Sequence, residues 1–189
     1  ADHYVATLFD PAPEEDLEWD GMAQLWYPAP LSRPSQASAV EPYDTFQEKV
    51  EPYWPWATRE YVIMDGGLTV APLTLNPPFP CTRSEFFKVS FLVALQAGAN
   101  RDDFFAHWLD THVTNVGETM ETVGGFRYVI GHSLEPETEP FAGMAELYFP
   151  DSGAWETYQD TFKPDGFERW VDYDATLRFY SGTEMLGIE

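Results

Sequence analysis

The alternation of apolar and polar positions between residues 86 and 188 predicts a defined series of strands and helices. The run FFKVSFLVAL (86–95) is apolar, aromatic and β-branched, which is typical of a buried strand. Residues 126–134, 143–149 and 176–188 also read as strands, whereas 101–120 and 151–162 have helical spacing. The predicted order is β-α-β-β-α-β, the split βαβ or ferredoxin-like plan.

The helix predicted over 101–120 has recognisable start and stop signals. Asn100 can cap its first turn, with Asp103 three residues on, and Gly124 and Gly125 end it. Its apolar stripe consists of Phe105, Trp108, Leu109, His112 and Val116.

Part of this pattern occurs twice in the chain. DGMAQLWYP (20–28) matches AGMAELYFP (142–150), and YDTFQEKVEP (43–52) matches WETYQDTFKP (155–164). A weaker match joins HYVATLF (3–9) to RYVIGHS (127–133). Because the three matches keep one order, we expect a tandem repeat whose first copy lacks the opening strand and helix. Gln24 of the first copy stands where the second has Glu146, so the halves are not expected to be functionally equal.

The repeat predicts a domain organisation. An incomplete strand-strand-helix-strand unit is expected over residues 1–72, and a complete unit over 86–189. The proline-rich segment 73–85 between them is expected to be a linker. The stretch 29–42, which also contains several prolines, is expected to be a surface loop inserted in the first copy.

Charge and cysteine content narrow the classes of partner and site. The 189 residues include 32 acidic and 10 basic side chains, a net charge of -22. This charge repels nucleic acid and anionic membrane surfaces, so neither is an expected partner. The single cysteine, Cys81, allows no intramolecular disulfide and no cysteine-based zinc site. Cysteine use therefore does not specify the compartment, and we favour the cytoplasm.

A family resemblance rests on several motifs of the second copy. FKVSFLVAL, DDFFAHWLDTHV, YVIGHSL and FAGMAELYF follow one another, and an aromatic helix begins near AWETY. With these motifs, residues 86–189 resemble the EthD family of the dimeric α/β-barrel superfamily. The resemblance implies an α+β fold of two ferredoxin-like units, with antiparallel sheets and helices packed on them.

The resemblance also implies where a ligand binds. Each unit of such a fold has a pocket between its sheet and its helices. Here the two halves of one chain would supply the two units, and a homodimer is also compatible with the family. Because the first half has no histidine-bearing helix, we expect one competent pocket, in the second half.

His107 and His112 are candidate residues on the predicted helix. His112 lies on the apolar stripe and should point inward, as a core histidine or as a general acid or base. The resemblance favours the catalytic role. His107 lies about 140° around the helix from it, where it should fix the helix and border the substrate. Two metal ligands on one helix usually stand at i and i+4, so no metal site is predicted.

Two strands supply further candidates for proton transfer. Tyr128 and His132 share one strand face by period two. If that face meets the helices, both side chains approach His112; alternatively, His132 ends its strand and bonds the following loop. Glu146 lies in mid-strand, where burial in a pocket would raise its pKa and make it a base. The alternative is a Glu146 that faces solvent or an interface.

Aromatic side chains complete the predicted site. Core packing is the ordinary role for aromatics at such spacing, and a ligand wall is the alternative. The residues assigned to substrate binding besides His107 are Trp108, Tyr148, Trp155 and Tyr158. No Gly-rich phosphate loop, G-x-G-x-x-G or G-x-S-x-G motif occurs in the sequence, and no cofactor is predicted.

These features together suggest a cofactor-free lyase, dehydratase or cyclase. The expected substrate is a small apolar molecule with a carbonyl or phenol group, such as an aromatic or polyketide-like compound. His112 would transfer the proton, with His132, Tyr128 or Glu146 as partner. The alternative is a non-catalytic module that binds a hydrophobic small molecule.

Overall fold

A computed structural model of the chain describes residues 2–11, 19–29, 54–67, 73–74 and 81–188. Its strands form one antiparallel sheet in the order β2-β1-β8-β5-β7-β6-β3, and β4 pairs with the start of β5. The strands are β1 (His3–Leu8), β2 (Gly21–Trp26), β3 (Thr58–Asp65), β4 (Leu73–Thr74), β5 (Cys81–Val93), β6 (Arg127–Ser133), β7 (Gly143–Phe149) and β8 (Leu177–Ile188).

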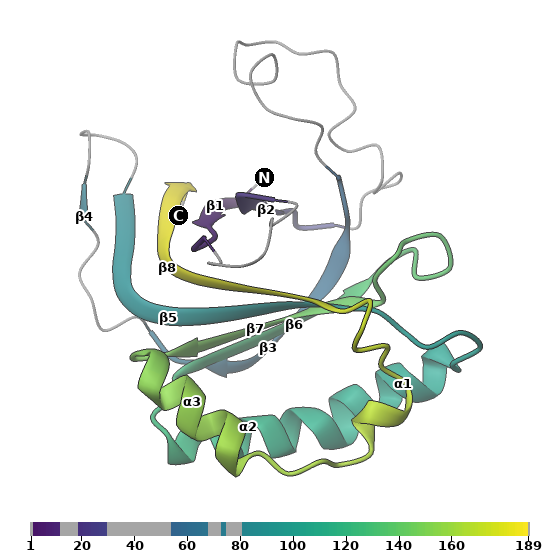
Figure 1. Ribbon diagram of the computed structural model, residues 1–189. Helices are drawn as coiled ribbons and strands as arrows, with labels where there is room; N and C mark the ends of the chain where they lie inside the picture. The colour runs from purple at the N-terminus through teal and green to yellow at the C-terminus, as the bar shows by residue number, and fades with distance from the viewer. Residues whose placement is uncertain (1, 12–18, 30–53, 68–72, 75–80, 189) are drawn as a thin grey trace.

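Helices cover one face of this sheet, which gives the protein an α+β fold (Figure 1). The helical segments are α1 (Arg101–His107), the π-helical turn η2 (Trp108–His112), α2 (Val113–Thr122), α3 (Ser152–Thr161) and the short 3-10 turn η3 (Phe167–Arg169). The predicted β-α-β-β-α-β order is therefore found from β5 to β8, with the strands arranged β8-β5-β7-β6.

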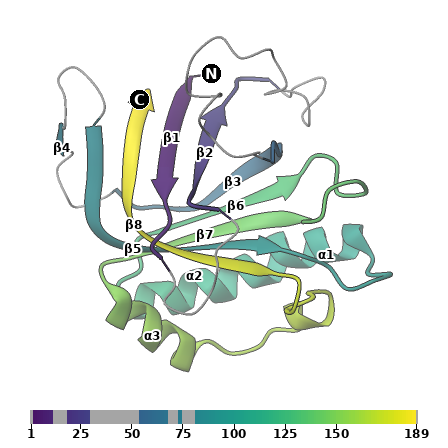
Figure 2. The same ribbon diagram turned by 45° about the horizontal axis from the view of Figure 1, so that its top comes forward.

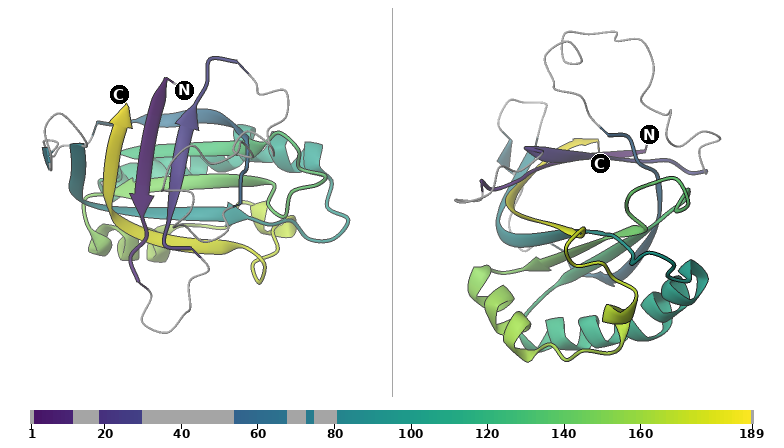
Figure 3. Two further views of the ribbon diagram at one scale, coloured as in Figure 1. Left: turned by 90° about the horizontal axis from the view of Figure 1, so that it is seen from above. Right: turned by 45° about the vertical axis from the view of Figure 1, so that its right-hand side comes forward.

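The sheet curls strongly, because β5 and β8 are 13 and 12 residues long and bend along their length (Figure 2). Their outer parts carry β1 and β2 across the concave side of the sheet, opposite the helices (Figure 3). The concave side is thus enclosed by two layers of strands. The other side is closed by helices.

The start of β5 differs from the prediction. The strand begins at Cys81 rather than at Phe86, and β4 lies within the predicted linker 73–85. A register shift between Ser84 and Lys88, with Glu85 at φ 67°, interrupts the pairing with β8. Because of this bulge, residues before and after it do not follow one period-two pattern, since an extra residue reverses which side chains share a face. The first part of β5 was therefore not predicted as a strand.

The predicted cap at Asn100 is confirmed, and Asp151 caps α3 in the same way. The Asn100 side chain accepts a hydrogen bond of 3.1 Å from the Asp103 backbone N–H, and Asp151 accepts one of 2.9 Å from Ala154. The turn η2 was not predicted. In it the Val113 N–H bonds to the Trp108 carbonyl, the i→i+5 pattern of a π-helix.

Two apolar cores lie on the two faces of the sheet. The larger lies beneath the helices and includes Phe104, Trp108, Tyr128, Phe149 and Trp155. The smaller lies on the concave side, where Trp54, Phe141 and Phe179 pack together with Phe9 and Trp19. Apart from Ala29, the predicted loop 29–42 lies outside the described residues, as does the predicted helix near 43–52.

The β1–β2 and β6–β7 hairpins have the same register at the positions matched by the sequence repeat. His3 pairs with Trp26, and Arg127 pairs with Tyr148. Where β1 meets β8, the register shifts between Tyr4 and Val5. Where β6 meets β3, the pairing shifts at the matched position, opposite Val62 and Met64. The two hairpins therefore join the sheet in the same manner, at its two ends.

Candidate functional site

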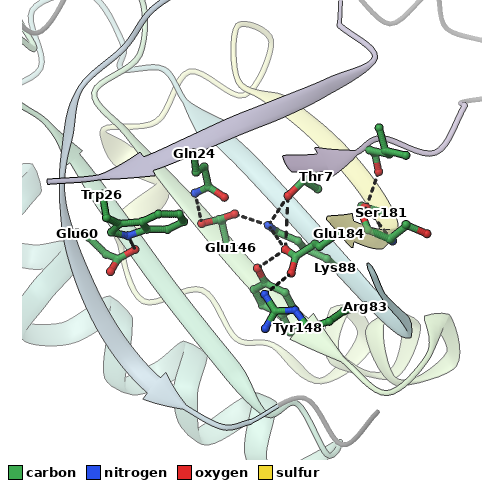
Figure 4. A network of polar contacts seen from close by, with 12 residues as sticks. Thr7, Gln24, Trp26, Glu60, Arg83, Lys88, Glu146, Tyr148, Ser181 and Glu184 are labelled. Carbon is green, nitrogen blue, oxygen red and sulfur yellow. Dashed lines mark hydrogen bonds and ion pairs between the residues drawn. The ribbon is translucent and has the colours of Figure 1, made fainter. Parts of the chain in front are cut away.

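A group of charged side chains points into the concave side of the sheet. Lys88 comes from the middle of β5, Glu146 and Tyr148 from β7, and Glu184 from β8 (Figure 4). All four are buried, and Lys88 has no exposed surface. Adjacent strands bring them together: Lys88 pairs with Tyr148 across the sheet, and Ser90 pairs with Glu146.

Lys88 lies between two carboxylates. Its Nζ is 2.5 Å from Glu146 Oε1 and 2.9 Å from Glu184 Oε1. The ammonium also donates to Thr7 Oγ1 over 3.2 Å. A buried ammonium of this kind is tolerated because opposite charges and hydrogen bonds replace the water that it loses.

Three neighbours hold the carboxylates in place. The Tyr148 hydroxyl donates to Glu184 Oε1 over 2.7 Å, and Arg83 Nη2 donates to Glu184 Oε2 over 3.1 Å. Gln24 Nε2, from β2, donates to Glu146 Oε2 over 2.9 Å. Glu146 is therefore held from two layers of the sheet, by Lys88 and by Gln24.

The ionisation of this group follows from its contacts. Burial would lower the pKa of Lys88, but Glu146, Tyr148 and Glu184 outweigh it and raise that pKa well above its usual value. Burial would raise the pKa of Glu184, but Lys88, Tyr148 and Arg83 outweigh it and lower that pKa. Burial raises the pKa of Tyr148. Lys88 and Glu184 are therefore charged at neutral pH, and Tyr148 keeps its proton.

A cavity of about 540 Å³ opens beside this group. It falls within the range of small-molecule sites. The lining residues are His3, Val5, Gln24, Trp26, Glu60, Asp65, Gly66, Gly67, Arg83, Arg127, Val129, Glu146, Tyr148, Glu184 and Leu186. The lining mixes charged side chains with apolar ones such as Val5, Val129 and Leu186, unlike the apolar pocket expected between sheet and helices.

His107 and His112 lie on the other side of the sheet, in the helical layer, where their rings face the loop that follows α3. His112 Nδ1 is 2.9 Å from Asp165 Oδ2, and its ring stacks on Phe167 with ring centroids 3.7 Å apart. His107 Nε2 lies 3.5 Å from Asp165 Oδ1. The predicted 140° separation is wrong, because the π-helical turn between the two histidines brings both rings to one carboxylate.

Asp165 was missed by the sequence reasoning. It follows α3 in a loop, and Asn115 Nδ2 and the Phe167 N–H also donate to it. Burial would raise its pKa, but Asn115 and His112 outweigh burial and lower it. Burial lowers the pKa of His112, although Asp165 opposes this. The cluster ties the loop to the helix.

His132 and Tyr128 face the helices, as one prediction had it, but they do not meet His112. The His132 ring stacks on Phe105 with centroids 4.2 Å apart, and Trp108 Nε1 donates to the Tyr128 hydroxyl over 3.4 Å. Burial lowers the pKa of His132 to about 4 and raises that of Tyr128. No contact joins the His132 and His112 rings among the described residues.

The predicted site residues are therefore divided between two faces. Those on the helical side of the sheet are His107, His112, Tyr128, His132, Trp108, Trp155 and Tyr158. Glu146 and Tyr148 line the cavity on the concave side. Trp155 and Tyr158 stack on each other in the larger core, with centroids 5.4 Å apart. A single pocket does not bring the whole predicted set together.

The sequence reasoning passed over Lys88, Glu184, Arg83 and His3. Lys88 and Glu184 each stand in the middle of a strand-like run, and a charge at such a position was a usable signal. Arg83 lies in the predicted linker, and His3 lies in the weakest of the three repeat matches. His3 begins β1 and lines the cavity.

The described residues contain no group of three or more His, Cys, Asp or Glu side chains placed to hold a metal ion. Among the described helices, none has the length and apolar character needed to cross a bilayer.

Comparison with known proteins bears on the family. No curated protein matches the chain with significance. Residues 96–175, which run from the end of β5 to the start of β8, match the family model of the EthD domain. The predicted resemblance to the EthD family is thus confirmed over residues 96–175.

Proposed function

We propose that the chain is an acid–base enzyme, a lyase, dehydratase or cyclase, whose reaction takes place in the concave cavity. The observation that carries the proposal is the carboxylate of Glu146 at the cavity wall, held by Lys88 and Gln24. Its substrate would be a small molecule with a carbonyl or phenol group. This proposal keeps the reaction class expected from the sequence and moves the proton-transfer group from His112 to Glu146.

Glu146 is the better candidate because it adjoins a space that can hold a substrate. His112 stacks on Phe167 and uses its Nδ1 on Asp165, whereas Glu146 lines the cavity. Geometry is the first requirement for a general base, since it must reach the proton that it removes.

The neighbours of Glu146 suit the removal of a proton beside a carbonyl. The carboxylate takes the proton from carbon, and the electron pair moves onto the carbonyl oxygen as an enolate. Arg83 and Arg127 line the cavity and can stabilise that negative oxygen. Protonated Glu146 then returns its proton, either to a leaving hydroxyl group, which departs as water, or to the alkoxide formed when the enolate attacks a second carbonyl. Neither route involves a redox change.

We also propose that the chain is a duplicated ferredoxin-like protein of the dimeric α/β-barrel type. The shared register of the two hairpins supports this, as do the register shifts at matched positions. The matched residues Gln24 and Glu146 bond to each other across the interior. The cavity therefore lies where the two units would meet.

Hydrogen exchange of substrate carbon atoms tests the proposed reaction. The protein is incubated in D₂O with a panel of β-keto and phenolic compounds, and NMR follows deuterium uptake beside the carbonyl. Glu146→Gln should abolish catalysed uptake, whereas His112→Gln and the surface control Glu121→Gln should retain it. Loss in His112→Gln with retention in Glu146→Gln would return the role to His112.

A non-catalytic binding module is the second candidate. The observation in its favour is that Lys88 and Glu184 are fully engaged with each other and with Thr7, Tyr148 and Arg83. A purely structural role, holding the interior together, is sufficient to explain such a network. Compounds that bind in the cavity without any exchange in the wild type would favour this module.

A further inference from the structure

We propose that the edges of β2 and β3 form a slot for an extended strand of another polypeptide, one that points a basic side chain into the cavity. The inference rests on the duplication proposed above, and it goes beyond the proposed reaction. The slot is defined by Gln24 and Trp26 of β2 and by Glu60 and Val62 of β3.

The two strands end the sheet on opposite sides. Within the described part of the chain, β2 pairs with β1 alone, and β3 pairs with β6 alone. The matching strands of the other half, β7 and β8, both pair with β5 between them. No described strand occupies the β5 position between β2 and β3, so among the described residues the facing edges of β2 and β3 are unpaired and can bond to the backbone of an added strand.

A side-chain hydrogen bond spans the slot. Tyr148 of β7 reaches across β5 to Glu184 of β8 over 2.7 Å. The matching pair is Trp26 of β2 and Glu60 of β3, and the Trp26 indole donates to Glu60 over 2.8 Å. β7 and β8 are two strand spacings apart, about 9.6 Å. A side-chain bridge of the same kind therefore joins the edges of β2 and β3.

The exposure of matched residues also points to a missing strand. Val62 on β3 pairs with Val129, as Leu186 on β8 pairs with Val5. Leu186 lies beside β5 and is 6% exposed, whereas Val62 is 45% exposed. A strand in the slot would cover Val62 as β5 covers Leu186.

Charge identifies the kind of strand that fits. In β5 the side chain that points inward is Lys88, which binds Glu184. Glu60 of β3 stands at the position that matches Glu184, so it can bind a lysine in the same way. The protein carries a net charge of -22, which favours a basic partner. The expected occupant alternates apolar and other residues, as strand addition to a sheet edge requires, with Lys or Arg at the inward centre.

A peptide with the sequence of residues 81–95 is the probe, because β5 already fits the equivalent position and its first residue pairs with Leu186. It carries a neutral solubilising tail, and calorimetry compares it with the same peptide in which the lysine is glutamate. The lysine peptide should bind at least about tenfold more tightly to the wild type. Glu60→Lys should reverse the preference, and Glu121→Lys should leave it unchanged.

Hydrogen–deuterium exchange locates the bound peptide. Amides of β2 and β3 should gain protection when the lysine peptide is added, while those of β7 and β8 stay as they were. The proposal is overturned if neither peptide binds, if both bind equally, or if the β2 and β3 edges are already protected in the free protein. None of these outcomes depends on turnover, so they are independent of the exchange reaction expected from Glu146.

Discussion

At the scale of single residues, Lys88 shows what a buried charge requires. Its ammonium has no exposed surface and has two carboxylates within 3 Å, at 2.5 and 2.9 Å. Burial alone would favour a neutral amine, and the two negative charges reverse that preference. The lysine and its carboxylates therefore depend on one another, and none of the three can be removed without effect on the others.

Removal of the ammonium alone should be strongly destabilising. Lys88→Met leaves Glu146 and Glu184 buried without their counter-ion, and we expect a loss of about 3–5 kcal/mol in the free energy of unfolding. The triple variant Lys88→Met, Glu146→Gln, Glu184→Gln should recover most of this loss. Urea denaturation measures both, and a loss below about 1 kcal/mol in Lys88→Met would contradict the assigned role.

His132 predicts a dependence of stability on pH. Its Nε2 is buried without a hydrogen-bond partner among the described residues, and burial lowers its pKa from 6.5 to about 4. Between these values the unfolded chain binds the extra proton, so stability falls as the pH drops through this window. His132→Phe keeps the stack on Phe105 and removes the proton site.

The size of this effect can be measured by urea denaturation between pH 7 and pH 4. Over that range the wild type should lose up to about 3 kcal/mol more than His132→Phe. His3→Phe, which replaces an exposed histidine, serves as the control and should follow the wild type. Parallel curves for the wild type and His132→Phe would show that His132 is not held neutral.

At the scale of elements, the π-helical turn and the loop after α3 work together. The turn brings the His107 and His112 rings to one side. Asp165 is hydrogen-bonded to His112, and its other carboxylate oxygen lies 3.5 Å from His107 Nε2. The same carboxylate accepts from Asn115 on α2. The loop that leads into η3 is thereby fixed to the long helical layer.

Asp165→Ala should weaken this attachment. The loss of several hydrogen bonds to a charged acceptor is expected to lower the free energy of unfolding by about 2 kcal/mol at pH 7. Since the folded pKa of Asp165 is lowered, its contribution is present above the usual carboxyl pKa and is lost as the pH falls through the folded value. The difference from the wild type should therefore shrink below about pH 4.

The matched control for Asp165→Ala is Asp160→Ala, which replaces an exposed carboxylate on α3. Thermal denaturation at pH 7 and at pH 3 should leave this control close to the wild type. An equal effect of the two substitutions would mean that Asp165 adds no specific attachment.

At the scale of the whole molecule, Gln24 joins the two layers of strands around the cavity. Its amide donates to Glu146 Oε2 across the interior. A glutamate at position 24 would place a second carboxylate beside that of Glu146. Such a pair holds one proton and has a raised pKa.

Gln24→Glu should therefore make the free energy of unfolding fall as the pH rises. A carboxyl group whose pKa is raised in the folded protein stabilises the fold at low pH. This stabilisation is lost as the pH rises through the folded pKa. Between pH 5 and pH 8 we expect the variant to lose about 2 kcal/mol relative to the wild type. Gln24→Met removes the hydrogen bond without adding a charge, so its deficit should not change with pH in the same denaturation experiments.

Much of the fold could be predicted from local patterns in the second half of the chain. The caps at Asn100 and Asp151 depend on contacts between residues three apart, which the local sequence shows. The order of elements from β5 to β8 follows from the hydrophobic periodicity of each segment. The π-helical turn at 108–112 and the bulge at Glu85 could not be predicted. Each inserts a residue into a regular element, and only packing against the rest of the molecule stabilises it.

The sequence by itself determined which side chains share a face, and the tertiary structure decided which face that was. Every residue of β7 is buried, because helices cover one side and strands cover the other. The pattern of β7 could therefore not tell whether Glu146 faces His112 or the cavity. The curl of the sheet decided this, because it encloses Lys88, Glu146 and Glu184 from strands distant in sequence, and burial makes their mutual attraction necessary.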